Sequence, residues 1–228
     1  MTQHMINLCL LCLVLALTAG CKCASAPGLG PDTTTAPSPT PSATEPALSP
    51  VRGPAKDLII QLDDLPQGFQ TVTAEPNGSK GYTAFYVRPE ALATQGAVEE
   101  NLLAVAVDLT IHDSAAEAEE AFAAEGDLDQ GSLAAAMGEA SPDATVIDVT
   151  SYPLALEEAS EAAAFRVLYE IGPLSVIDYR YRFVVSNAEA NVVVTAPAQE
   201  GGQDPPGLAE RAQALAERQV SRLVEARE

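Results

Sequence analysis

Two neighbouring segments of this chain, residues 164–171 and 178–185, alternate between side chains of opposite character, which is typical of strands. The aromatic and branched members fall at odd positions: Phe165, Val167, Tyr169, Ile171, Tyr179, Tyr181, Phe183 and Val185. Gly172 and Pro173 mark a turn between the segments. Residues 191–195 resemble a third strand, after a short turn near 187–190. The sequence therefore predicts an antiparallel sheet.

Three arginines occupy even positions of the first two segments: Arg166, Arg180 and Arg182. Opposed residues of an antiparallel pair point to one side, so the two aromatic faces coincide only across a loop with an odd number of residues. We expect three or five loop residues, which would put all three arginines on one face. As a hypothesis, they bind a small anionic ligand or an acidic envelope protein, because guanidinium suits carboxylates and phosphates. Alternatively, they pair across strands with Glu170 and Asp178 and keep this face soluble.

The remaining periodic segments predict one more strand and four helices. Residues 103–111 alternate as a strand with one buried face. We expect helices over 57–65, from the cap Ser114 to about Glu125, over 132–139, and through Val224 from an N-cap at Asp204. These elements indicate an α+β fold: a mainly antiparallel sheet with helices packed on one face and the other face partly wet.

The first 55 residues differ in composition from the rest of the chain. Residues 6–19 form an apolar run that suits a signal peptide and is shorter than the ~20 residues of a membrane-spanning helix. Residues 24–54 contain eight prolines and almost no large apolar side chains, so they cannot bury enough surface to fold. We expect a signal peptide over 1–20, a disordered linker over 21–55 and one extracytoplasmic domain over 56–228.

The pentapeptide that ends the apolar run, Leu17-Thr18-Ala19-Gly20-Cys21, resembles the lipobox of bacterial lipoproteins. The resemblance implies cleavage before Cys21 and acyl chains, such as palmitate, on the new N-terminal residue. Two or three chains anchor a protein stably, because each buried CH₂ contributes ~0.8 kcal/mol. We expect a lipid anchor at the outer face of the cell membrane, or in the outer membrane if the host has one. An uncleaved apolar segment and an ordinary signal peptide are the alternatives.

The net charge of −20 restricts the partners of the exported part, because every charged side chain follows Cys21. An acidic surface repels phosphate backbones and anionic lipid headgroups. We therefore expect no nucleic-acid partner, and the lipid would provide the membrane attachment that the protein surface does not.

Residues 62–69 (LDDLPQGF) resemble the D-L-P-x-G-F phrase near the start of many small extracytoplasmic lipoproteins and sensor-kinase ectodomains of bacteria. The later order of elements is also similar: strand, Ala-rich helix, hairpin of Tyr and Arg, valine strand and terminal helix. The resemblance implies a ligand-sensing or accessory envelope module, with a PsbP-like α+β fold as one form of it. It supplies no catalytic residues.

We expect no metal, cofactor or catalytic residue in the domain. Positions 24–228 contain no cysteine and one histidine, His112, so a zinc site would need mostly carboxylates. The acidic turn Glu125–Gly131 departs from an EF-hand at three positions, which favours a solvated connection over calcium. Asp57, Asp63 and Asp64 are interpreted as the polar face of a helix. No nucleophile elbow, P-loop or dinucleotide motif is present.

The anchor, the linker and the missing catalytic motifs together favour a membrane-anchored lipoprotein whose domain is a binding or sensing module. Two alternatives stay open. A carboxylate-based hydrolase would show two buried acids with raised pKa values in a cleft. A carrier of an apolar ligand would show a deep apolar cavity.

Overall fold

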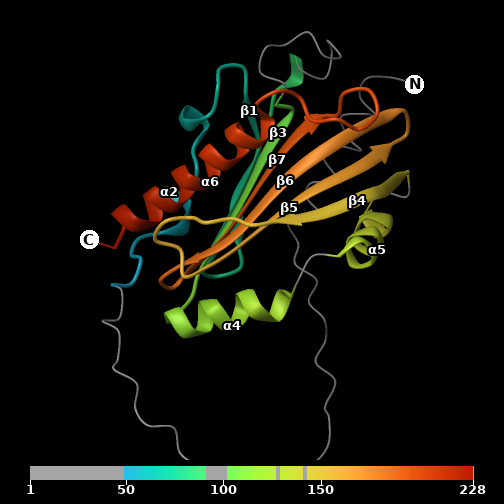
Figure 1. The fold of residues 1–228 in the computed structure, drawn as a ribbon. Coiled ribbons are helices and arrows are strands. Elements are labelled where there is room, and N and C mark those ends of the chain that lie inside the picture. The colour runs from blue at the N-terminus through green and yellow to red at the C-terminus, as the bar shows by residue number, and fades with distance from the viewer. Residues whose placement is uncertain (1–48, 91–101, 127–128, 141–142, 228) are drawn as a thin grey trace, which may run out of the picture.

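The computed structural model describes residues 49–90, 102–126, 129–140 and 143–227 (Figure 1). The expected signal peptide and most of the expected linker lie outside these residues. Within them, helices flank a seven-stranded sheet, so the α+β class with a mainly antiparallel sheet is confirmed. The strands are β1 Gln70–Asn77, β2 Gly81–Val87, β3 Ala104–Ile111, β4 Ala144–Tyr152, β5 Glu161–Ile171, β6 Leu174–Val185 and β7 Ala188–Pro197.

The strand order is β1-β2-β3-β7-β6-β5-β4, and every neighbouring pair is antiparallel. The strands predicted around β3, β5, β6 and β7 are confirmed. The sequence patterns do not predict β1, β2 and β4. β1 and β4 form the mostly exposed edges and β2 is buried on both faces, so none of the three shows the alternation of a half-buried strand.

The loop between β5 and β6 contains two residues, because Ile171 pairs with Leu174. The prediction of three or five residues is therefore wrong. Gly172, with φ of +57°, takes the first loop position, which suits the type II′ turn that commonly joins twisted strands. An even loop shifts the parity of the hairpin by one residue, so the odd positions of β5 and β6 face opposite sides of the sheet.

Helices cover both faces of the sheet, so the prediction that they pack on one face is wrong. They are α2 Ala55–Leu58, α4 Ala115–Glu125, α5 Gln130–Ala140 and α6 Leu208–Glu225. Leu215 and Leu223 of α6 join the main core with Tyr181. Leu133 of α5 packs with Tyr169 on the other face, where α4 also contacts β6 and β7. Figure 1 shows α6 lying along the sheet and α4 on the other side of it.

The opening helix predicted over 57–65 is broken into two short turns. α2 ends at Leu58, residues 59–61 are not helical, and a 3₁₀ helix follows over Leu62–Asp64. Ile59 and Ile60 are both buried at 1% exposure or less. The Ile60 N–H donates to Gln219 of α6 and the Leu58 carbonyl accepts from it, so backbone bonds to α6 take the place of a continuing helix.

The closing helix is confirmed over Leu208–Glu225, with a different start. Its expected stripe is buried throughout: Leu208, Ala212, Leu215, Gln219 and Leu223. Gly207, at φ of +67°, stands at the N-cap. The prediction that Asp204 caps this helix is wrong, because its carboxylate binds Arg166 and Tyr179.

The chain packs into the domain already at Val51, which is 3% exposed. Its N–H donates to Asn187 Oδ1 at 2.7 Å. Asn187, in the β6–β7 turn, also bonds the main chain of His112 in both directions, through N–H···O contacts of 2.8 and 2.9 Å. One residue thus ties the entering segment to the ends of β3 and β7.

Candidate functional site

The structure does not bring the three predicted ligand arginines together. Arg166 lies opposite Tyr179 in the β5–β6 register and shares the face that α6 covers. Arg180 and Arg182 lie on the other face, with Phe165 opposite Arg180. The prediction of one arginine face is therefore wrong, and its cause is the two-residue loop. The side chains are only 20%, 6% and 12% exposed in chain order, and each has an acidic partner.

Arg166 fixes the segment that leads into α6. Its Nε binds Asp204 Oδ1 at 2.8 Å and its guanidinium donates to the Gly202 carbonyl at 2.8 Å. The Tyr179 hydroxyl donates to the other oxygen of Asp204 at 2.5 Å. Burial, and next the carboxylate of Asp204, raise the pKa of Tyr179. The tyrosine hydroxyl therefore stays protonated and donates its hydrogen bond, and the cluster holds the segment before α6 against β5 and β6.

Arg180 and Asp178 form a buried ion pair at 2.8 Å within β6. Both residues are buried, at 5% and 1% exposure. The second oxygen of Asp178 accepts from the Tyr169 hydroxyl at 3.0 Å and the Thr195 hydroxyl at 2.7 Å. These contacts satisfy the carboxylate inside the sheet, so Arg180 is not available to a ligand.

Arg182 clamps the last turn of α4 onto the sheet. It donates to the carbonyls of Phe122 and Gly126, both at 3.1 Å, and binds Glu125 at 2.8 Å. Its guanidinium also lies 4.7 Å from the centre of the Phe122 ring. A cation at a helix C-terminus satisfies carbonyls that lack a partner within the helix. The Ser114 cap at the other end of α4 is confirmed, since its hydroxyl accepts from Glu117 N–H.

His112 has an acidic partner that the sequence does not indicate. Its Nε2 lies 3.2 Å from Glu189 Oε2, across β3 and β7. Glu189 also faces Arg182 at 3.8 Å. Burial, and next the charge of Glu125, raise the pKa of Glu189. The two glutamates and Arg182 therefore form one charged cluster under α4.

Asp108 is a second buried acid on this face. Burial raises its pKa to about 6, although a hydrogen bond from the Thr83 hydroxyl opposes that rise. A carboxylate-based hydrolase would need two buried acids with raised pKa values that share a cleft. Asp108 and Glu189 both have raised pKa values, but neither is among the residues that line the cavity described in the next paragraph.

The described part of the chain does contain an open cavity of about 450 Å³ at the end of the sheet where the chain enters the domain. Three segments line it: residues 53–56, the β1–β2 turn with its flanks over 76–82, and the end of β3 over 111–113. Gly81 is required there, since a Cβ would lie 2.4 Å from the Asn77 carbonyl oxygen. The tight hairpin turn therefore shapes one wall of the cavity.

The cavity collects two of the three lysines of an acidic chain, Lys56 and Lys80. The Lys80 ammonium binds Asp113 at 2.5 Å, and Lys56 is exposed. His112, Tyr82 and Ile111 are also among the lining residues. The arrangement can hold a small anion beside a modest apolar group. Sequence reasoning missed it because the lysines lie far apart along the chain, although their scarcity is a signal.

The acidic turn Glu125–Gly131 is only partly described, since residues 127 and 128 lie outside the described ranges. Asp129 accepts from the N–H groups of Gly131 and Ser132, at 2.7 and 3.0 Å, and so caps the start of α5. These bonds lower the pKa of Asp129. Among the residues that the structure describes, no group of three His, Asp or Glu side chains could hold a metal ion.

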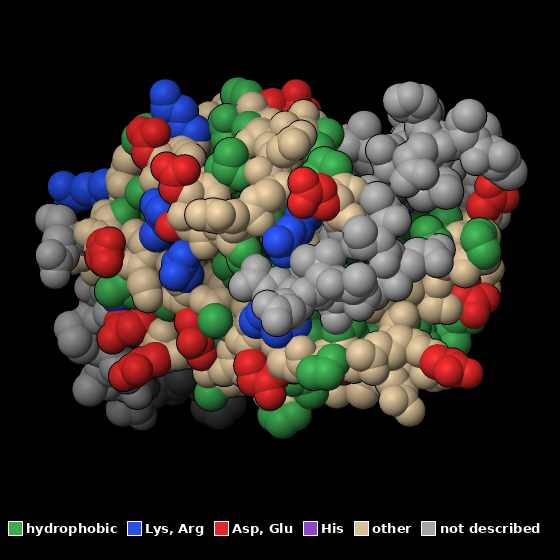
Figure 2. Space-filling view, turned by 90° about the horizontal axis from the view of Figure 1, so that it is seen from above, with side chains coloured by type: hydrophobic (Ala, Val, Ile, Leu, Met, Phe, Trp, Pro, Cys, Tyr) green, Lys and Arg blue, Asp and Glu red, His purple; other side chains and the backbone are tan. Residues whose placement is uncertain are grey.

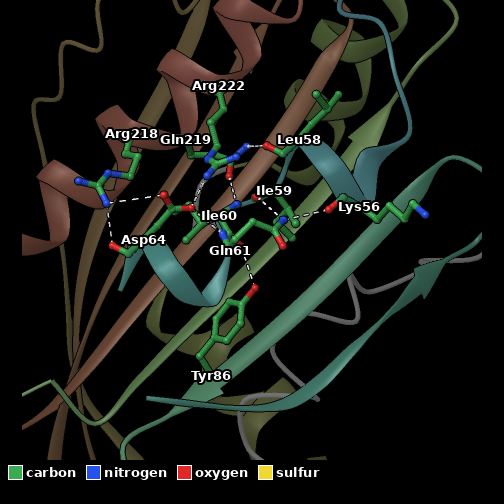
Figure 3. Close-up of polar contacts among 10 residues, drawn as sticks. All are labelled: Lys56, Leu58, Ile59, Ile60, Gln61, Asp64, Tyr86, Arg218, Gln219 and Arg222. Atoms are coloured by element: carbon green, nitrogen blue, oxygen red, sulfur yellow. Dashed lines mark hydrogen bonds and ion pairs between the residues drawn. The ribbon is translucent and has the colours of Figure 1, made fainter. Parts of the chain in front are cut away.

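The D-L-P-x-G-F phrase has a structural role, which Figure 3 shows. Asp64 binds Arg222 at 2.5 Å and lies 3.8 Å from Arg218, so it joins the 3₁₀ helix to α6. Gln219 is fully buried and bonds two backbone groups just before the phrase, Ile60 N–H and the Leu58 carbonyl, both at 2.8 Å. Residues 58–64 therefore form a clamp for α6, to which the phrase contributes Asp64. Asp64 does not belong to a polar helix face shared with Asp57 and Asp63.

Basic and acidic side chains are interspersed on the surface that Figure 2 shows, with no broad basic patch in view. No helix in the described ranges is long and apolar enough to span a membrane.

Comparison with known proteins gives weak structural likenesses, of which two are described here. No family model and no curated protein matches the chain. An uncharacterized protein from Mycobacterium smegmatis is similar in structure, with 14% identity, a TM-score of 0.35, and coverage of 75% of this chain and 83% of its own. The Ran-binding protein Mog1p of Saccharomyces cerevisiae has 10% identity, a TM-score of 0.29, and coverage of 71% and 86%. At these TM-scores, neither likeness assigns a function.

Proposed function

We propose that this protein is a lipid-anchored extracytoplasmic lipoprotein whose domain binds a small anionic ligand in the cavity beside Lys56 and Lys80. The cavity is the observation that carries the proposal. It gathers two of three lysines in a chain of net charge −20, at the point where the linker enters the domain.

We place the ligand site at the lysines and not at the three arginines of the sheet because the acidic partners of the two sets differ in burial. The three arginines of the sheet are mostly buried and bind Asp204, Asp178 and Glu125. Asp113, the partner of Lys80, is 79% exposed, so this ion pair contributes little and opens easily. A carboxylate or phosphate that enters the cavity can take its place.

Removing both lysine charges is expected to weaken anion binding at least about tenfold, since charge-assisted hydrogen bonds contribute roughly 1.5–3 kcal/mol each. The test is calorimetric titration of inorganic phosphate and succinate into the wild-type domain and the Lys56→Gln/Lys80→Gln variant. Asp113→Asn frees Lys80 and is expected to tighten binding. Arg218→Gln removes an exposed cation elsewhere and should leave it unchanged. Equal affinities in all four proteins would refute the cavity as the site.

The anchor has its own test, intact-mass analysis of the membrane fraction. We expect a mature chain that begins at Cys21 and carries acyl chains, and a Cys21→Ala variant that is neither acylated nor held in this fraction. An unacylated wild-type chain would contradict the lipoprotein part of the proposal. It would leave the binding result intact, because the cavity belongs to the folded domain.

A further inference from the structure

One row of polar side chains crosses four strands on the face that α4 covers. Thr83 of β2 pairs with Asp108 of β3, Asp108 with Asn191 of β7, and Asn191 with Arg182 of β6. Paired residues of antiparallel strands point to the same side, so the four side chains are neighbours in this order. Arg182 ends the row by binding the last turn of α4.

Two oxygen atoms in the middle of this row are buried without a hydrogen bond. They are Asp108 Oδ2 and Asn191 Oδ1, on directly paired residues. Both are acceptors when the carboxyl group is ionised, and two buried acceptors cannot satisfy each other. A proton on Asp108 Oδ2 would turn one of them into a donor and remove both defects, since a buried polar atom without a partner destabilises the fold.

We propose that the Asp108 carboxyl group is protonated in the folded protein and donates a hydrogen bond to Asn191 Oδ1, and that loss of this proton to solvent loosens the last turn of α4. The inference is independent of the ligand cavity. It concerns how firmly α4 is held on the sheet.

The charged surroundings explain why the proton matters to α4. The titratable and charged described groups on the same face as Asp108 are His112 just after its own strand, Glu189 on β7, Arg180 and Arg182 on β6, and Glu125 on α4. After burial, the charge of Glu125 also raises the pKa of both Asp108 and Glu189, so Glu125 repels each of these carboxylates when they are charged.

Ionised Asp108 therefore acts on the contact that holds α4. Its charge repels Glu125, which is 53% exposed and can move toward solvent. Arg182 would then keep Glu189 and its two carbonyl contacts and lose the Glu125 carboxylate. Ala118 is the single α4 residue that is fully buried, so little apolar packing opposes the movement.

The direction of the pH effect follows from the raised pKa of Asp108, about 6 in the folded protein against 3.8 for a free carboxyl. The closed form binds the proton more tightly than an opened form, so closure is favoured at low pH and weakens as pH rises through about 6. Between pH 5 and pH 7, the opening constant of α4 is expected to rise about tenfold and then level off.

The experiment is hydrogen exchange of the α4 amides at several pH values between 5 and 8, corrected for the intrinsic pH dependence of exchange. Wild type should lose about tenfold protection in the last turn of α4 between pH 5 and pH 7. Asp108→Asn keeps a donor for Asn191 at every pH, so its corrected protection should stay flat. Glu170→Gln, an exposed acid on β5, serves as the control and should behave as wild type.

A second variant keeps the proposal testable if Asp108→Asn does not fold. Thr83→Val removes the hydrogen bond that stabilises the ionised form, so the midpoint of the α4 transition should move to higher pH. Carbon-detected NMR of the Asp108 carboxyl group gives its pKa directly. Titration below about pH 4.5, as for a carboxylate bound by a flipped Asn191 amide, would overturn the proposal. So would the same pH dependence of α4 in wild type and Asp108→Asn.

Discussion

Asp178→Ala is expected to lower the free energy of unfolding by about 3–5 kcal/mol, because it leaves the Arg180 guanidinium charged and buried without its carboxylate partner. The two side chains lie 2.8 Å apart at 6% and 1% exposure. The variant also removes the acceptor of the Tyr169 and Thr195 hydroxyl groups. Urea denaturation followed by circular dichroism measures the loss.

Two further variants separate the destabilisation caused by an unpaired buried charge from the stability that the ion pair itself contributes. Glu170→Ala removes an exposed acid from β5 and should change stability by less than about 0.5 kcal/mol. Asp178→Leu/Arg180→Met removes both charges and should recover much of the loss, because a buried pair contributes little beyond apolar packing. A loss below about 1 kcal/mol for Asp178→Ala would mean that water reaches the pair, contrary to the structure.

Gln219→Leu is expected to cost on the order of 2–4 kcal/mol, because it leaves two buried backbone groups without partners. The amide of Gln219 accepts from Ile60 N–H and donates to the Leu58 carbonyl, both at 2.8 Å (Figure 3). Leucine has nearly the same volume, so the loss reports hydrogen bonding rather than a cavity. The same denaturation experiment measures it.

Gln213→Leu is the matched control, since Gln213 lies on the exposed side of the same helix. It should change stability by less than about 0.5 kcal/mol. Hydrogen exchange adds a local readout, because the Ile60 amide should lose protection in Gln219→Leu and keep it in Gln213→Leu. Retained protection of Ile60 in Gln219→Leu would show that the clamp does not depend on this side chain.

The alternating segments predict their strands correctly because successive residues of a strand point to opposite faces, so two kinds of side chain alternate along the sequence even where both faces are buried. The α6 stripe is predicted for the same reason, with the helical period. β1, β2 and β4 are missed because their sequences show no alternation of side-chain type. Burial alone does not explain the difference, because β6 is buried on both faces as β2 is, whereas β1 and β4 are mostly exposed.

The candidate site shows a similar limit. The three arginines are identified from the sequence as unusual, yet their grouping depends on a loop length that differs by one residue from the expected one. Gly172 at the first loop position favours a two-residue turn by itself. The sequence prediction instead assumes that the aromatic residues of both strands face one side, which requires an odd loop. That assumption is wrong, because helices cover both sides of the sheet and both sides contain apolar clusters.

The sequence by itself determines the α+β class, the central strands, the closing helix and the acidic charge, because these depend on local periodicity and composition. The tertiary structure alone decides the strand register, the pairing of every arginine of the sheet, and the meeting of Lys56, Lys80 and His112 at one cavity. It also decides that Asp108 faces Asn191 in the interior. Such contacts join residues that are distant along the chain, and only packing of the elements fixes which of them meet.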